Sequence, residues 1–555
     1  MSICLVLPRL FTLFALRVPL PSPPASSLAD SSDPSFEYAV ASLAAELVDF
    51  AVAFRLDYAA SLVAESESDC PPSAGGECAL GMGVLEDRKE DFECFAAGVP
   101  HLVSMLIAPE RDPDALDIPA PRSLAEAITG PHSSQWQAAM DAEKASWKST
   151  STYVNAVPPP GVNIVDGMWI FRVNRPLGSP PAFKPRYVAR GFSPRQGVDF
   201  FQTFSPTPKM TTLRVLLHVV ARRDYELHSL DFSTTFLQGS LHEEILLRRP
   251  PGFTGSFPAS TQWSLRRPVY RLHQAPREWH DTLRRTLAAL GCAPSTANPS
   301  LFLRTDTLLP PFYVLVYLVL QITRDRARRI ITLTQSHMVH QVLQRFSFRY
   351  SSPLSTPLPT SHSLLIPPSD KSVEPSGLYP ELVGCLMYLM TCTRPDLAYP
   401  LSIMARYIAS GRHRPEHWEA AKRMLCYLCC TSGMGLVLGG RGPFFLTGHT
   451  DTSWIDDLAT QRSSQVYTFS LGSGFISLQS TRSSSVLCSS CEAEIYARAM
   501  AAQELCWLTY LLTDLGERPR SSPILYVDNK AMIALCQEHR LEHRTKHIDL
   551  RYFLA

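Results

Sequence analysis

The sequence of 555 residues lacks an excess of charge of one sign, because 52 lysines and arginines nearly balance 51 aspartates and glutamates. Net charge alone therefore does not indicate a nucleic-acid-binding protein. No uninterrupted apolar run has the length of a membrane helix, so we expect no membrane partner. The 14 cysteines lack the spacing of a disulfide framework, which favours a reducing, intracellular compartment, cytoplasmic or nuclear. A C-x-x-C pair at Cys488 and Cys491 has no second ligand pair nearby, so we expect no zinc there.

The N-terminal region lacks a recognisable targeting signal. Its apolar run from Ile3 to Leu20 is interrupted by Pro8, Arg9 and Arg17, and the charged–apolar–small order of a signal peptide is missing. We interpret this run as a translated leader of no targeting value. Residues 1–120 are rich in alanine, serine, proline and acidic residues, which predicts a largely disordered linker region.

Regular elements are predicted from about residue 123 onward. Trp136, Met140 and Trp147 lie on or near one face of a predicted amphipathic helix. Residues 167–173 and 187–189 read as paired strands. Further helices are predicted over residues 210–223 and 333–348, and another begins near Pro415, a residue that suits a helix N-terminus.

One carboxylate stands out at the end of a short strand-like run. Leu227 to Leu230 lead into Asp231, and a carboxylate in that position can hold a hard divalent cation. The alternative is a strand that ends in an ordinary aspartate. Upstream, residues 184–195 contain four basic residues and no acidic one, so the charge is unevenly placed.

The flanks of Asp231 carry a family resemblance. They include F-K-P-R-Y-V-A-R-G-F at 183–192, G-V-D-F-F-Q-T-F-S-P at 197–206 and Q-A-P-R-E-W at 274–279. Together these motifs resemble the reverse transcriptase of Ty1/copia-type retrotransposon Pol polyproteins, from about Trp136 to the C-terminus. The resemblance implies an α/β (α+β) fold: a polymerase fingers–palm fold at 121–317, a helical thumb and connection remnant at 318–440, and an RNase H-like α/β domain at 441–555.

The resemblance also implies roles for individual residues of the polymerase part. Asp231 matches the first metal-binding carboxylate of the palm, and Phe236 the bulky residue that rejects a ribose 2′-hydroxyl. Gln274 belongs to a substrate-binding block. Lys184, Arg186 and Arg190 would contact a triphosphate or template phosphate, to which basic side chains bring charge and donors. The alternatives are a core aromatic for Phe236 and a solvated basic face for the three cations.

Two departures predict that polymerase chemistry is lost. The family's Y-G-L-K-Q reads Y-R-L-H-Q here, so Arg271 replaces a glycine and would project toward the nucleotide or template. The Y-V-D-D hairpin is missing: Tyr317 is followed directly by Leu318 and a segment that resembles a later part of the family. Two-metal phosphoryl transfer needs several carboxylates, and Asp231 alone cannot supply them. Binding of dNTP is correspondingly doubtful.

The last block resembles the family's RNase H domain. Its motifs contain Asp451, Glu494, Asp528 and Asp549, which by this resemblance converge on two Mg²⁺ (or Mn²⁺) ions. The alternative is four unrelated surface carboxylates. Ser453, Val466 and Leu478 depart from the usual aspartate, glycine and tryptophan, and the chain stops soon after Asp549, so we expect its last helix to be clipped.

These observations predict a degenerate reverse transcriptase/RNase H fragment that acts on an RNA–DNA hybrid, an RNA template and a DNA primer. A gag zinc knuckle, an aspartic-protease D-[ST]-G motif and an integrase zinc motif are all missing from the sequence. The alternative function is that of a non-catalytic nucleic-acid-binding remnant of a transposable element.

Overall fold

The fold is taken from a computed structural model. It describes residues 2–7, 118–174, 181–190, 193–251, 258–304, 312–317, 321–359, 378–408, 413–457, 460–518 and 521–538, apart from residues 196, 202, 204, 207, 208, 232–236, 238, 259, 290 and 350. Helices and strands alternate along these ranges, so the molecule is a mixed helix-and-sheet protein, as the sequence predicts.

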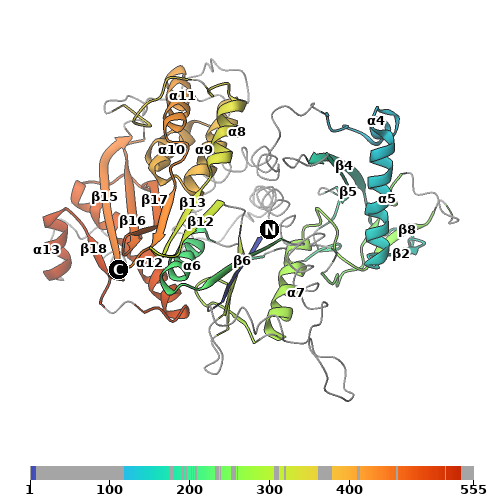
Figure 1. The fold of residues 1–555 in the computed structure, drawn as a ribbon, viewed down its shortest axis with the longest axis horizontal. Helices are drawn as coiled ribbons and strands as arrows, with labels where there is room; N and C mark the ends of the chain where they lie inside the picture. Colours follow the sequence, from blue (N-terminus) through green and yellow to red (C-terminus); the bar gives the residue numbers. More distant parts are fainter. Residues whose placement is uncertain are drawn as a thin grey trace, which may run out of the picture.

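In the first group of elements, helix α5 packs against strand β5 of a hairpin, and helix α4 packs against α5 (Figure 1). Helix α5 buries Trp136, Met140 and Trp147, which confirms the predicted apolar face. Trp136 contacts Phe171 and Phe183 edge-on, at centroid distances of 5.1 and 4.9 Å. The elements are α4 (Leu124–Thr129), α5 (Ser133–Ser149), β4 (Gly167–Asn174) and β5 (Ala182–Ala189), with β4 and β5 antiparallel as predicted.

A small sheet, built from strands that precede and follow the hairpin in the chain, is linked to the hairpin by a hydrogen bond. Its strand order is β2-β8-β7-β3, and the Tyr187 hydroxyl of β5 donates to the Arg248 carbonyl at 2.8 Å, directly after β7. Tyr153 of β2 stacks on Trp263 of β8 at 3.9 Å. The strands are β2 (Tyr153–Ala156), β3 (Ile164–Val165), β7 (Leu246–Leu247) and β8 (Gln262–Leu265).

The sheet that contains Asp231, called here the Asp231 sheet, has five strands in the order β6-β1-β11-β10-β9. Helix α6 precedes it with the predicted bounds and ends at Asp224, whose left-handed φ of 56° stops the helix. The elements are β1 (Ser2–Leu7), α6 (Met210–Arg223), β6 (Glu226–Asp231), α7 (Ala275–Ala289), β9 (Ala293–Pro294), β10 (Leu301–Arg304) and β11 (Phe312–Tyr317).

Strand β1 departs from the linker assigned to residues 1–120. Residues 2–7 lie inside the Asp231 sheet, between β6 and β11. The run S-I-C-L-V-L is uncharged and contains Ile3 and Val6, whose branched side chains favour strands. Pro8 follows at once and cannot donate a backbone hydrogen bond. A short apolar run of this kind suits a strand with neighbours on both sides.

A three-stranded sheet, β12-β13-β14, and a group of helices follow. The helix predicted over 333–348 is shorter, because Leu333 and Thr334 belong to β13 and α8 begins at Ser336. The β-branched run Ile330–Thr332 favours a strand there. Pro415 begins a helix, as predicted. The elements are β12 (Gln321–Asp325), β13 (Ile330–Thr334), α8 (Ser336–Arg345), α9 (Leu378–Cys392), α10 (Ala398–Met404), α11 (Pro415–Cys430) and β14 (Leu436–Gly439), with single 3₁₀ turns at Pro395–Leu397 and Ala405–Tyr407.

The last sheet, called here the Asp451 sheet, has the order β17-β16-β15-β18. Its first three strands are antiparallel, and β18 joins β15 in parallel. Helix α12 packs against β15 and β16. The elements are β15 (Leu446–Asp457), β16 (Arg462–Leu471), β17 (Gly474–Arg482), α12 (Ser490–Asp514), β18 (Ile524–Tyr526) and α13 (Lys530–Glu538).

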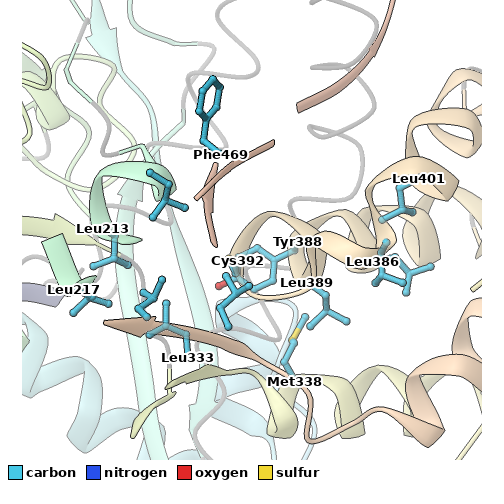
Figure 2. Close-up of a cluster of buried hydrophobic side chains, with 14 of the residues drawn as sticks. Leu213, Leu217, Leu333, Met338, Leu386, Tyr388, Leu389, Cys392, Leu401 and Phe469 are labelled. Carbon is cyan, nitrogen blue, oxygen red and sulfur yellow. The ribbon is translucent and has the colours of Figure 1, made fainter. Parts of the chain in front are cut away.

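One hydrophobic core joins the Asp231 sheet to the Asp451 sheet. It runs from Leu213 of α6 through α9 and α11 to Phe469 of β16 and Leu515, and Figure 2 shows part of it. The buried guanidinium of Arg214 reinforces the junction, because it donates to the Ile476 carbonyl of β17 and to the Thr391 and Cys392 carbonyls of α9. A second core contains buried side chains of α5, β4, β5, β8 and α7, among them Trp136, Tyr187 and Trp263. Among the described residues, no helix is both long and apolar enough to cross a membrane.

Candidate metal centre

The register of two parallel strands places two aspartates at the same sheet edge. His449 of β15 pairs with Tyr526 of β18, and their rings stack at 4.9 Å with an interplanar angle of 18°. Asp451 lies two residues beyond His449 within β15, and Asp528 lies two residues beyond Tyr526, just past the end of β18. Because the two strands are parallel and in register, residues at equal distances beyond this pair lie side by side.

A tightly packed glycine lets β15 fit between its neighbours. A Cβ at Gly448 would lie 2.3 Å from the Phe469 ring of β16 and 2.9 Å from the Leu525 side chain of β18. Glycine is the residue that permits so close an approach. The close packing at Gly448 therefore helps to fix the position of β15, and with it the position of Asp451 three residues later.

The third carboxylate comes from the first turns of α12. The Ser489 hydroxyl caps this helix by accepting from the Glu492 N–H at 3.1 Å. One residue beyond Ala493 stands Glu494, which is buried at 5% exposure. Among the described residues, its carboxylate oxygen Oε2 has no hydrogen-bond partner. A buried carboxylate oxygen without a donor is costly unless something else compensates its charge.

The three carboxylates form one cluster. Asp451, Glu494 and Asp528 each offer an oxygen, and these oxygens lie within 4.8 Å of one another. Burial, followed by repulsion from Asp528 and Asp451, raises the pKa of Glu494 to about 7, while a hydrogen bond from the Thr452 backbone opposes the shift. Like charges held this close favour either a bound proton or a bound cation.

The donor set fits a hard divalent cation. All three ligands are carboxylate oxygens, two are exposed, and the third has an unpartnered buried oxygen. Mg²⁺ prefers oxygen ligands of this kind, and two-metal sites hold their ions about 3.5–4 Å apart between shared carboxylates. The residues present therefore fit the cation that the sequence predicts, with Asp451 and Asp528 accessible from solvent.

Comparison with known proteins identifies the family. A family model described as reverse transcriptase (RNA-dependent DNA polymerase) matches residues 150–323. The retrovirus-related Pol polyprotein from transposon TNT 1-94 of Nicotiana tabacum is 30% identical over 82% of this chain and 36% of its own length. Those from transposons RE2 and RE1 of Arabidopsis thaliana are both 32% identical, over 77% and 75% of this chain.

The chain belongs to the Ty1/copia-type Pol polyprotein family. It spans about a third of the length of these relatives, which are covered over 36%, 31% and 31% of their sequences. The matched stretches include the reverse transcriptase motifs around Asp231, so the resemblance carried by those motifs is confirmed at the level of the family.

Among the described residues of this Pol chain, the cluster consists of Asp451, Glu494 and Asp528. Asp231 ends strand β6 in the Asp231 sheet. Asp549, the fourth expected carboxylate, and Phe236, the expected sugar-contacting residue, both lie outside the described residues. Their roles stay predictions.

The three expected phosphate-binding cations of the Pol chain differ in their surroundings. Lys184 is exposed on β5. The Arg186 guanidinium lies over the Tyr270 ring, 4.9 Å from its centroid. Arg190 lies 3.4 Å from the carboxylate of Asp166, which also pairs with Arg248 at 3.0 Å. Lys184 is therefore the cation most available to a phosphate.

Gln274 lies inside the fold rather than on a surface. Its side chain is fully buried and donates to the Asp199 carbonyl at 2.9 Å, and its Oε1 has no partner. In this conformation the amide anchors the segment around Asp199, and its predicted role as a substrate-binding residue stays a prediction.

Arg271 shows a second reason for glycine in the family motif. Its φ is 66°, in the left-handed region that glycine adopts readily and arginine does not. A glycine in the family motif by itself indicates close approach of a ligand at this position. The backbone itself requires the unusual conformation, and a side chain there strains it.

Proposed function

We propose that this chain is a degenerate fragment of a Ty1/copia-type Pol polyprotein whose residual chemistry is cleavage of the RNA strand of an RNA–DNA hybrid. One observation carries the proposal: Asp451 comes from a strand, Glu494 from a helix and Asp528 from the segment after a second strand, yet their oxygens lie within 4.8 Å of one another. Asp549 is the proposed fourth ligand, and Mg²⁺ or Mn²⁺ the proposed cation. The Asp451 sheet and α12 would then form an RNase H-like domain.

Each residue has a separate part in this proposal. Asp451 and Asp528 are exposed and would be accessible to an incoming phosphate. Glu494 is buried, and its place on helix α12 fixes its position. When bound, the cations would activate a water and stabilise the leaving oxygen of a phosphodiester. The three carboxylates would supply the negative charge that binds the cations and would fix where the cations lie relative to the phosphodiester.

The same proposal holds that polymerase chemistry is lost. The Asp231 sheet would be the palm, and the α4, α5, β4 and β5 group the fingers. The next two strands of the Asp231 sheet add no carboxylate, because β1 (S-I-C-L-V-L) and β11 (F-Y-V-L-V-Y) contain no aspartate or glutamate. A two-metal site with Asp231 as its only protein carboxylate would lack the ligands that hold a second cation.

Hybrid cleavage by the purified chain tests the proposal. Cleavage of a labelled RNA–DNA hybrid should require Mg²⁺ or Mn²⁺ and fall to background in the Asp451→Asn, Glu494→Gln and Asp528→Asn variants. Asp231→Asn is the matched control and should leave cleavage unchanged. Cleavage that continues in EDTA or in the Asp528→Asn protein would refute the assignment.

Primer extension tests the second half of the proposal. We expect no template-dependent incorporation of dNTP. Incorporation that Asp231→Asn abolishes would show that the polymerase site works after all. If both reactions fail while the chain still binds hybrid, the function is that of a non-catalytic nucleic-acid-binding remnant, which the exposed Lys184 would serve.

A further inference from the structure

The Asp231 sheet is held together by a strand from the far N-terminal end of the chain. Strand β1 is antiparallel to both of its neighbours: Ser2–Val6 pair with Tyr317–Tyr313 of β11, and Ser2–Leu7 pair with Asp231–Glu226 of β6. Among the described strands, β6 pairs with β1 alone. The strand that carries Asp231 is thus connected to the rest of its sheet only through residues 2–7.

The position of β1 matches that of a strand the sequence lacks. A hairpin that continued from Tyr317 would return antiparallel to β11. Strand β10 already occupies one side of β11, so the return strand would lie on the side where β1 lies. The chain after Tyr317 instead supplies β12, which belongs to a different sheet.

We propose that the gap between β6 and β11 is a strand-binding site, occupied by residues 2–7 of the same chain in place of the absent return strand. Without an occupant, the facing edges of β6 and β11 would carry unpaired N–H and C=O groups beside the buried side chains of Tyr313 and Leu315. The site therefore takes an extended, uncharged, proline-free segment that can pair on both edges.

The occupant restores the sheet but not the metal ligands. Ser2 pairs with both Asp231 and Tyr317, at the end of the sheet where the Y-V-D-D aspartates would follow Tyr317. Strand β1 brings no carboxylate to that end. The site would therefore also accept a separate peptide of the same chemistry by adding it as a strand, the general mode called β-augmentation.

Disulfide trapping in the full-length chain tests the register. Cys4 pairs with Ser229, and directly opposed residues have Cβ atoms about 4.5–5.5 Å apart, close to disulfide range. The Ser229→Cys variant should give a Cys4 crosslink under mild oxidation, identified by mass spectrometry of the digest. Leu230→Cys should not, because neighbouring strand residues point to opposite faces. Adding Cys4→Ser to Ser229→Cys should abolish the crosslink. Its absence in Ser229→Cys, or an equal yield in Leu230→Cys, would overturn the proposal.

Peptide binding tests the site itself. Leu5→Pro removes a backbone donor in the middle of β1 and should empty the site in the full-length chain. A fluorescent peptide of residues 1–10 should then bind this variant at least about tenfold more tightly than wild type, whose site is filled. Thr12→Pro, outside β1, is the matched control and should behave as wild type. Equal binding by all three proteins would overturn the proposal even if the crosslink forms.

Discussion

His449 and Tyr526 stack face to face across two parallel strands, two residues before Asp451 and Asp528. Both rings lie on the exposed side of their strands, where Tyr526 keeps 51% of its surface. The strand register places the two aspartates side by side, and the ring stack supports that register. The geometry of the cluster is therefore a property of the sheet, and the buried Glu494 on α12 completes it.

The raised pKa of Glu494 predicts a pH-dependent stability. Its pKa is about 7 in the fold and near 4.5 when unfolded, so between these values the folded protein binds more protons. The stability of the metal-free protein should therefore fall as pH rises from about 4.5 to 7. Glu494→Gln should remove this part of the slope and raise Tm at pH 8. Thermal melts in EDTA across this range provide the measurement, and Glu419→Gln, an exposed control, should keep the slope.

Mg²⁺ bound to the same carboxylates should stabilise the folded protein, and it should do so more strongly at high pH than at low pH. A cation that binds only the folded state stabilises it by about 2.7 kcal/mol at one hundred times its Kd. Mg²⁺ should raise the Tm of wild type at pH 8, less at pH 5.5 where Glu494 is protonated, and not at all in Glu494→Gln. An equal rise in the variant would show that the ion binds elsewhere.

The left-handed backbone at Arg271 predicts that glycine stabilises the chain there. This conformation destabilises a residue with a side chain by about 1–2 kcal/mol. Glycine avoids that cost, but it also makes the unfolded state more flexible, and this cancels part of the gain in stability. Arg271→Gly should therefore raise the free energy of unfolding by up to about 1 kcal/mol in urea melts. Arg266→Gly, at an exposed position without a positive φ, should lower it.

The parts of the fold that depend on local pattern could be predicted from the sequence. The apolar spacing of α6 and the apolar run Met168–Phe171 of β4 specify those elements without distant partners. The place of β1 could not be predicted in this way, because its pairing with Asp231 spans more than two hundred residues and leaves no local periodicity. Leu333 was assigned to a helix because a short apolar run does not distinguish strand from helix.

The candidate site was predicted differently from the fold. Asp451, Glu494 and Asp528 came from motif resemblance, since no spacing rule brings together residues this far apart. Long-range packing buries Gln274 and pairs Arg190 with Asp166. Neither outcome can be predicted from the residue type alone. At Arg271 the sequence itself shows an arginine in a glycine position. That difference fits two physical causes, close approach of a ligand and a left-handed backbone.

The buried Arg214 predicts a strong coupling of α6 to strand β17 of the Asp451 sheet and to helix α9. Burial lowers its pKa to about 10, yet its guanidinium donates to three carbonyls of β17 and α9. Arg214→Ala would leave these acceptors unpaired and open a cavity, at a cost above about 2 kcal/mol. Arg222→Ala, whose guanidinium donates to the Gly442 carbonyl at an exposed site, should cost less than half as much in the same urea melts.

The exposed Lys184 predicts a measurable part of the salt dependence of nucleic-acid binding. Each phosphate contact releases a counterion, so removing one should lower the slope of log K against log salt by about 0.7–0.9. Lys184→Ala should show this change. Lys144→Ala, whose ammonium already pairs with Asp141 at 3.0 Å, should not. Equal slopes for the two variants would place the binding surface elsewhere.

We expect the side chain of Val466 to crowd the proposed ribonuclease site beside Asp451. Val466 is the register partner of Asp451 on β16, and directly opposed residues of antiparallel strands point to the same face. A branched side chain there stands beside the carboxylate, where the family usually has a glycine. Val466→Gly should raise kcat/KM for hybrid cleavage severalfold, a change on the order of 1 kcal/mol in transition-state stabilisation. It should also lower stability, because glycine weakens a strand.

Val437→Gly separates these two effects. Val437 lies on β14, is 51% exposed, and belongs to a different sheet from the carboxylates. It should lose a similar amount of stability without any gain in cleavage. Faster cleavage in both variants would mean that looser strands, rather than room beside Asp451, improve the reaction. Unchanged cleavage in Val466→Gly, measured at equal folded fraction, would show that the substrate phosphate does not approach Asp451 from the Val466 side.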